Sequence, residues 1–76
     1  LSRSLMGHVI INQESVELFK ILKFEGLASS GGEAKFVISE GLVCVNGRIE
    51  TQKRKKIVSG DTVEYNGNKL NILFET

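Results

Sequence analysis

Residues 29–49 read "SSGGEAKFVISEGLVCVNGRI", and the hydrophobic pattern changes once within this stretch. The first half predicts a helix, because apolar residues recur at helical spacing and Ser30 and Glu33 have the S-x-x-E spacing of a capping box. Gly41 supplies the left-handed residue that commonly follows a helix. The predicted buried stripe of this helix consists of Ala34, Val37 and Ile38.

After Gly41 the apolar residues alternate, as they do in a half-buried strand. Asn46-Gly47 is a dipeptide favoured in two-residue type I′ turns, so a β-hairpin is predicted here, with Cys44 on its outer face. Its core face is expected to contain Val43, Val45 and Ile49. A second hairpin is predicted around Asn66-Gly67. The core face of that hairpin is expected to contain Val63, Tyr65, Leu70, Ile72 and Phe74.

A first helix is predicted from Val16 to Glu25, with Ser15 as its N-cap and Gly26 after its end. Its apolar face consists of Leu18, Ile21 and Leu22. Residues 9–11 are a candidate short strand, and residues 59–61 predict a turn between the two hairpins. The predicted fold class is therefore α+β: two short N-terminal helices packed on a small antiparallel sheet built from two hairpins.

The chain has 76 residues, of which 41% are apolar and 25% charged, so one domain with one core is expected. We assign residues 15–76 to this domain and residues 1–14 to an N-terminal extension. Met6 is interpreted as the natural start, and residues 1–5 as an added remnant. The longest apolar runs are too short for a membrane span, and a single cysteine fits a reducing compartment, so we expect a cytoplasmic protein.

Catalysis is not expected, because reactive side chains are few and scattered. His8 is the only histidine and Cys44 the only cysteine, which is too few for a zinc site of the usual four-ligand kind. Cys44 lies between two valines and is interpreted as a small apolar residue rather than a nucleophile. We therefore predict no enzyme activity, no metal and no cofactor.

Positive charge is concentrated in one loop of a nearly neutral chain. The formal net charge is only +1, yet residues 53–56 are four consecutive cations and Arg48 precedes them. Adjacent like charges repel one another, and a loop needs fewer of them to be soluble. The run therefore predicts a local binding site for a polyanion, with a solvated surface loop as the alternative.

The start of the second helix adds a second candidate feature. Gly31 and Gly32 leave the first-turn amides without a covering side chain, and Lys35 lies one turn further along. Two glycines there cost roughly 1 kcal/mol each relative to alanine. Close approach of a phosphate to the helix N-terminus would explain why they are tolerated.

In their order and spacing, these features resemble the αL RNA-binding motif, the domain of small-subunit ribosomal protein S-four and of many RNA-modifying enzymes. The resemblance spans residues 16–65. It rests on Lys20, Leu22, Gly26-Leu27, Ser30, Ala34, Gly41, Val43, Val45-Asn46-Gly47 and Gly60-Asp61. The chain is most similar to the stand-alone subfamily of small RNA-binding proteins of the YbcJ and YaaA kind, which also have a basic run. Members of the wider family usually have an arginine at the place of Gly31, whereas this subfamily has Ser-Gly there with a nearby lysine like Lys35.

The resemblance implies a bacterial RNA-binding protein whose basic surface contacts the phosphates of structured RNA, either ribosomal or transfer RNA. The candidate RNA-binding residues are Lys20, Lys23, Ser30, Gly31, Lys35, Asn46, Arg48, Lys53, Arg54, Lys55 and Lys56. Phe36 falls off the apolar stripe; we expect it to pack on the first helix, with stacking on a base as the alternative. Two other functions stay open, namely a protein-interaction module for an acidic partner and a DNA-binding protein. The sequence leaves the oligomeric state open.

Overall fold

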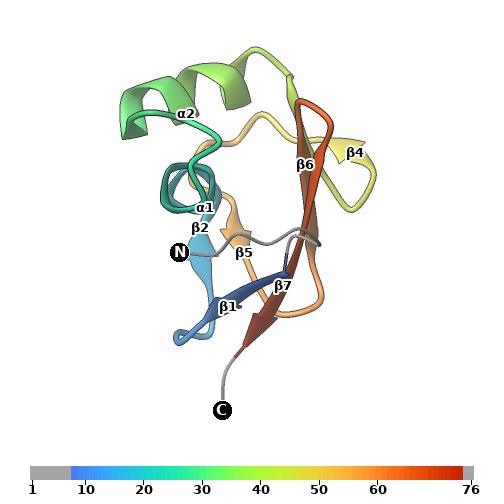
Figure 1. Ribbon diagram of the computed structural model, residues 1–76. Helices are drawn as coiled ribbons and strands as arrows, with labels where there is room; N and C mark the ends of the chain where they lie inside the picture. The colour runs from blue at the N-terminus through green and yellow to red at the C-terminus, as the bar shows by residue number, and fades with distance from the viewer. Residues whose placement is uncertain (1–7, 75–76) are drawn as a thin grey trace.

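The computed structural model describes residues 8–74 as an α+β fold. The elements in chain order are β1 (His8–Ile11), β2 (Val16–Glu17), α1 (Leu18–Phe24), α2 (Gly31–Ser39), β3 (Val43–Val45), β4 (Arg48–Ile49), β5 (Lys56–Ile57), β6 (Thr62–Tyr65) and β7 (Asn68–Phe74). A five-stranded sheet has the order β1-β7-β6-β3-β4, and β2 and β5 form a separate two-stranded sheet. The two helices lie beside each other on one side of the larger sheet (Figure 1).

The larger sheet is mixed, whereas the sequence predicted an antiparallel one. β1 pairs in parallel with β7, with Val9 opposite Ile72 and Ile11 opposite Phe74. Val9 and Ile11 are both buried, so the short apolar run completes the core at the edge of the sheet. The residues assigned to an N-terminal extension thus contribute a strand, and β1 and β2 both precede the helices. Residues 1–5 and Met6 lie outside the described residues.

Both Asn-Gly pairs form two-residue turns of antiparallel hairpins. Asn46 and Asn66 have φ angles of 54°, as a type I′ turn requires at its first position. The turns set the register, with Val45 opposite Arg48 in the first hairpin and Tyr65 opposite Asn68 in the second.

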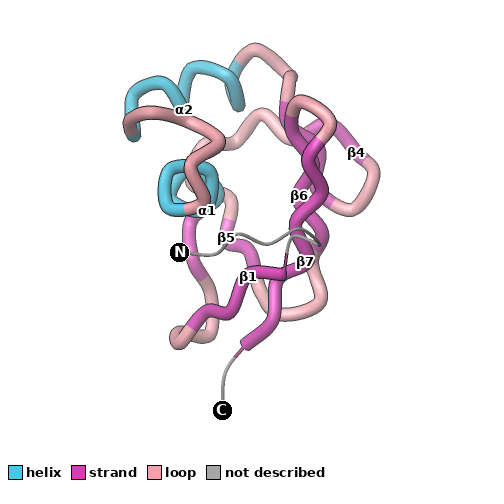
Figure 2. The backbone as a smooth tube through the Cα atoms, in the orientation of Figure 1, coloured by secondary structure: helices cyan, strands magenta, loops and turns pink. Residues whose placement is uncertain are grey.

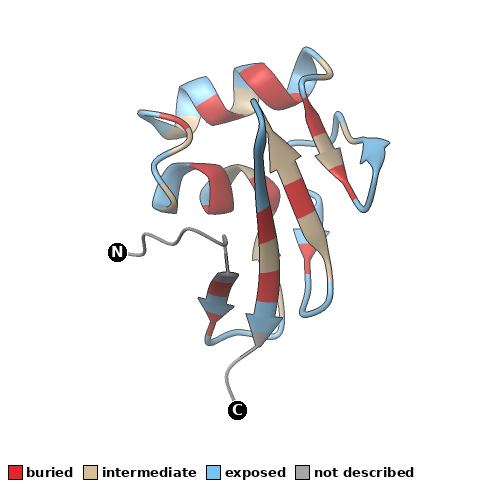
Figure 3. Cartoon of the chain, turned by 45° about the vertical axis from the view of Figure 1, so that its right-hand side comes forward, coloured by how far each residue is buried: buried red, intermediate tan, exposed pale blue. Residues whose placement is uncertain are grey.

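The prediction that Ile49 faces the core is wrong. Residues directly opposite each other share a face of the sheet, and Ile49 lies opposite Cys44 rather than opposite a core residue. Its side chain is 66% exposed, whereas Val43 and Val45 are buried. Figure 3 shows β4 as an exposed element at the periphery. The side chain of Phe74, also predicted in the core, lies outside what the structure describes.

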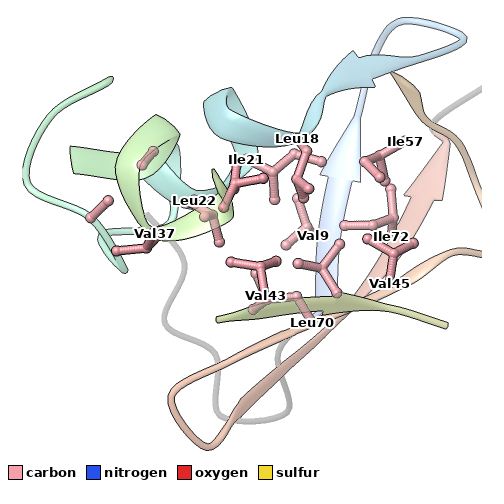
Figure 4. Close-up of a cluster of buried hydrophobic side chains, with 14 of the residues drawn as sticks. Val9, Leu18, Ile21, Leu22, Val37, Val43, Val45, Ile57, Leu70 and Ile72 are labelled. Carbon is pink, nitrogen blue, oxygen red and sulfur yellow. The ribbon is translucent and has the colours of Figure 1, made fainter. Parts of the chain in front are cut away.

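One hydrophobic core lies between the helices and the sheet (Figure 4). The apolar faces predicted for the two helices are both buried, as are the predicted core valines of the strands. The residues with no more than 1% exposure are Leu18, Ile21, Leu22, Ala34, Ile38, Val43, Ile57, Val63 and Ile72. None of the helices within residues 8–74 is long and apolar enough to cross a bilayer.

Both helices end as predicted, at a glycine. Gly26 and Gly41 have φ angles of 77° and 79°, a conformation that side-chain-bearing residues rarely adopt. In α1, Leu27 donates its amide to the Leu22 carbonyl and Gly26 donates to Lys23, which is the hydrogen-bond pair of a Schellman motif. The same pair closes α2. Each cap turns the chain back toward the core.

The start of α1 differs from the prediction. The helix begins at Leu18 rather than Val16, and Glu17 rather than Ser15 is its N-cap residue, with no side-chain cap. The amide of Leu18 instead donates to the carbonyl of Lys55 at 2.9 Å, and the amide of Phe19 to that of Lys53 at 3.2 Å. The backbone of a sequence-distant loop therefore caps α1, and no local sequence signal announces such a cap.

The Asn46 side chain connects two turns. Its Nδ2 donates to Asp61 Oδ1 at 3.0 Å, and its Oδ1 accepts from the Thr62 amide at 2.9 Å. Asp61 Oδ2 accepts in turn from the Val58 amide at 2.9 Å. These bonds tie the β3–β4 turn to the β5–β6 turn.

We expect Asn46→Gly to lower the free energy of unfolding by about 1 kcal/mol more than Asn66→Gly does, since only the former loses side-chain hydrogen bonds. The two asparagines share a φ angle of 54° and the same turn position, so the backbone effect of glycine is matched. Urea denaturation of both variants measures the difference. Equal losses would mean that the Asn46–Asp61 link contributes nothing to stability.

α2 is capped largely as predicted. Ser30 Oγ accepts from the Glu33 amide at 3.1 Å. The capping box predicted that the Glu33 carboxylate would accept a hydrogen bond from the Ser30 amide. It accepts instead from the amide and the hydroxyl of Ser29, at 2.7 and 2.6 Å. These hydrogen bonds lower the pKa of Glu33, because they stabilise the charged carboxylate.

A lowered pKa in the folded state means that Glu33 stabilises the fold at neutral pH, and that this contribution is lost as the pH falls through the folded pKa. We therefore expect wild type to be more stable than Glu33→Gln near neutral pH and the difference to shrink toward about pH 2.5. Thermal unfolding across this range measures it, with Glu40→Gln at the other end of α2 as the control. A difference that stays constant with pH would contradict this.

Candidate nucleic-acid interface

The cationic run lies in a loop that packs against the start of α1. The Lys55 amide donates to the Gln52 carbonyl at 3.2 Å, so Lys53 and Arg54 occupy the centre of a tight turn. The carbonyls on either side of Arg54 are the caps of α1 described above. All four cationic residues, 53–56, are exposed, and the loop passes from β4 to β5 beside α1 (Figure 2).

Three cationic side chains, each from a different element, lie close to the ring of Phe19 in the first turn of α1. Its ring centroid lies 4.6 Å from Lys35 Nζ of α2, 5.7 Å from Arg54 Cζ of the loop and 6.0 Å from Lys20 Nζ of α1 itself. Cations within about 6 Å of an aromatic ring are attracted by its quadrupole. We call Phe19 and these three cations the Phe19 cluster.

The glycine-rich start of α2 lies against the same ring. A β-carbon at Gly31 would lie 3.8 Å from two ring carbons of Phe19, so the bare backbone of Gly31 faces the cluster. The Glu33 amide donates a hydrogen bond to Ser30 Oγ, and the Ala34 amide donates to the Ser30 carbonyl. Among residues 8–74 the amides of Gly31 and Gly32 have no acceptor, and the helix dipole adds a partial positive charge beside them.

One carboxylate lies within this cationic surface. Glu17 Oε2 is 3.4 Å from Arg54 Nη1, and Glu17 Oε1 is 3.6 Å from Lys20 Nζ. The Glu17 side chain is 27% exposed, compared with 49% for Lys20 and 67% for Arg54. Both cations of these pairs therefore remain open to solvent on their other sides.

The structure brings together only part of the predicted site. The residues in or beside the Phe19 cluster are Lys20, Gly31, Lys35, Lys53, Arg54, Lys55 and Lys56. Ser30 lies next to them as the N-cap of α2, and its hydroxyl oxygen accepts a hydrogen bond from the Glu33 amide. Lys23 is exposed in the last turn of α1 and is not among the three cations at the ring.

Two predicted residues lie elsewhere. Asn46 has both ends of its side-chain amide engaged with Asp61 and Thr62, so its position is explained by the fold. Arg48 is part of β4, which lies on the opposite side of the view from α1 (Figure 1). Phe36, expected to pack on the first helix, is instead 61% exposed.

Sequence reasoning missed the two residues at the centre of this surface. Phe19 lies at the edge of the apolar face formed by Leu18, Ile21 and Leu22, and an aromatic residue beside Lys20 in that position was a usable signal. The ion pair of Glu17 with Lys20 has a local spacing of three residues, but its pair with Arg54 joins residues that are far apart in sequence and gave no signal.

A groove of about 490 Å³ borders the cationic surface between the β1–β2 segment and α1. Its lining includes the exposed apolar residues Ile10 and Phe24, and its charged residues have both signs. Residues 8–74 contain no group of histidine, cysteine, aspartate or glutamate side chains suited to holding a metal ion. Among the described residues, the Phe19 cluster is the place where positively charged side chains from three elements converge.

Comparison with known proteins identifies two kinds of relative for this chain, curated proteins and solved structures. The "Putative RNA-binding protein YbcJ" of Escherichia coli (strain K12) is 48% identical over 58 residues, which are 76% of this chain and 83% of that protein. The "Probable ribosome maturation protein RlbA" of Bacillus subtilis (strain 168) is 36% identical over 59 residues, or 78% of this chain and 83% of that protein.

Two solved structures share the fold. The solution structure of E. coli YbcJ, described as having an αL motif involved in RNA binding, superposes with a TM-score of 0.71 at 41% identity, over 96% of this chain and 95% of that one. The 30S ribosomal protein S4e of Thermoplasma acidophilum superposes with a TM-score of 0.63 at 29% identity, over 76% of this chain and 31% of that one.

The resemblance predicted from the sequence is thereby confirmed. The match to the family pattern extends over residues 9–73, from β1 into β7, and so includes both helices and the loop that caps α1. The chain belongs to the S4 domain family.

Proposed function

We propose that this protein binds structured RNA without catalysing a reaction, and that the Phe19 cluster is the centre of its RNA-binding surface. The observation that carries the proposal is the convergence of Lys20, Lys35 and Arg54, from three different elements, within 6.0 Å of one ring. The exposed loop cations Lys53, Lys55 and Lys56 extend the surface.

Phosphate contacts are the interaction this surface supports best. The Arg54 guanidinium can bind two oxygens of one phosphate, whereas Lys20 and Lys35 act as point charges. The free amides of Gly31 and Gly32 add donors for one further phosphate oxygen. Each phosphate that is neutralised releases counterions from the RNA, which drives binding.

The arrangement favours folded RNA over a flexible single strand. The half-buried Phe19 ring has three cations and the Gly31 backbone close to it, which favours phosphate contacts over the stacking of a base on this ring. A surface that contacts mainly phosphates recognises shape, and the phosphates of an A-form helix are held at fixed spacings.

Ribosomal RNA is the first candidate ligand, and transfer RNA the second. The B. subtilis relative is named for ribosome maturation, and the archaeal structural relative is a protein of the small ribosomal subunit. We propose that the present protein acts on ribosomal RNA in the same way, in the bacterial cytoplasm. Its family and fold are of the RNA-binding type.

We expect Lys35→Gln and Arg54→Gln each to weaken RNA binding roughly three- to ten-fold and to reduce the slope of log affinity against log salt by about 0.7–0.9. Lys69→Gln, the same charge change on β7, serves as the control. Fluorescence anisotropy with a labelled ribosomal RNA hairpin at several salt concentrations measures both quantities. Equal losses in all three variants would assign binding to net charge instead of the Phe19 cluster, and tighter binding to duplex DNA would favour a DNA-binding protein.

Replacing residues 53–56 by alanine is expected to remove most of the RNA affinity while leaving the fold intact. The loop caps α1 with the backbone carbonyls of Lys53 and Lys55, which alanine retains. Circular dichroism and thermal unfolding check the fold, and the anisotropy assay checks binding. A variant that binds as well as wild type would show that the loop is only a solvated surface.

A further inference from the structure

Glu17 is the acidic residue whose position the proposed function leaves unexplained. A carboxylate among cations repels the phosphates of RNA, yet Glu17 contacts two members of the Phe19 cluster, Lys20 at 3.6 Å and Arg54 at 3.4 Å. It does not serve as a side-chain cap of α1, although it occupies the N-cap position. Within residues 8–74, these two cations are the side-chain partners of its carboxylate.

The backbone fixes the Glu17 carboxylate in this place. Glu17 is paired with Lys56 in the β2–β5 ladder, and the next amide, of Leu18, bonds to the Lys55 carbonyl at 2.9 Å. Arg54 and Lys20 are more exposed than Glu17 and have longer side chains, so they can turn from the carboxylate toward a ligand. Glu17 cannot leave the surface without disturbing the start of α1.

We propose that Glu17 is a built-in competitor of the RNA phosphates, an inference that rests on the proposed function. In the free protein its carboxylate neutralises part of the charge of Lys20 and Arg54. RNA binding transfers both cations from Glu17 to phosphates, and the carboxylate that remains opposes the bound RNA. Glu17 therefore limits the affinity for polyanions, so that a ligand must offer phosphates to both cations at once.

An organising role is the opposite possibility, because the ion pairs also hold Arg54 and Lys20 near the ring. Exposed ion pairs hold side chains only weakly, and the Arg54 side chain is 67% exposed. The ring contacts of both cations do not require Glu17. The repulsion between Glu17 and the RNA phosphates is therefore expected to outweigh any positioning of Arg54 and Lys20 by Glu17. Removing the Glu17 charge should then strengthen RNA binding.

The test is Glu17→Gln, which preserves the shape of the side chain and removes its charge. We expect RNA binding to become about two- to ten-fold tighter, and the slope of log affinity against log salt to become steeper by about 0.7–0.9, since one more net cation faces the phosphates. Glu40→Gln, the same charge change at the far end of α2, is expected to have a smaller effect. In an Arg54→Gln background, the gain from Glu17→Gln is expected to shrink, because one of its two partners is gone.

Unchanged or weaker RNA binding by a folded Glu17→Gln variant, or a gain no larger than that of Glu40→Gln, would overturn the inference. Thermal unfolding confirms that each variant is folded. Retention on immobilised heparin, a polyanion without bases, measures the competition between Glu17 and a bound polyanion independently of RNA. Later elution of Glu17→Gln than of Glu40→Gln supports the inference, and equal elution contradicts it. Failure of wild type to bind any RNA would overturn the proposed function, while the heparin result would still decide the role of Glu17.

Discussion

The arrangement of the cationic surface depends on two backbone hydrogen bonds between α1 and the loop before β5. The first amides of α1 donate to the carbonyls of Lys55 and Lys53, at 2.9 and 3.2 Å. The first turn of a helix always has unpaired amides, and here they are satisfied by the loop that contains the positive charge. The hydrogen bonds therefore complete the fold and place Arg54 beside Phe19 at the same time.

The surface shows why net charge is a poor guide to anion binding in a small protein. The chain carries a formal charge of only +1, but its cations are concentrated where three elements meet and several of its acids are used elsewhere. Asp61 accepts from Asn46 and Val58, and Glu33 accepts from Ser29. Local arrangement rather than total charge determines the potential that a phosphate meets at this surface.

The features that could be predicted from the sequence are those that local chemistry determines. The glycine ends of the helices, the Ser30 cap and the Asn-Gly turns each depend on residues within a few positions of one another. Two of the failures depend on distant contacts: the parallel pairing of β1 with β7, and the start of α1, which is set by two loop carbonyls. The face of Ile49 was missed for a different reason: the predicted two-residue turn places Arg48 opposite Val45, so Ile49 falls opposite Cys44 and on the outer face.

The departure from the family pattern at Gly31 has a physical explanation in this arrangement. The resemblance implies an arginine there in most members of the wider family, and a glycine with a nearby lysine in the stand-alone subfamily that this chain is most similar to. Gly31 lies against the Phe19 ring, and the same ring is approached by Lys35 from within α2 and by Arg54 from the loop. Positive charge is thus supplied to this place by neighbouring elements, while the glycine leaves the first amides of α2 open. The start of α2 therefore combines backbone donors with flanking cations from neighbouring elements, a combination that favours close approach of an anion to a helix N-terminus.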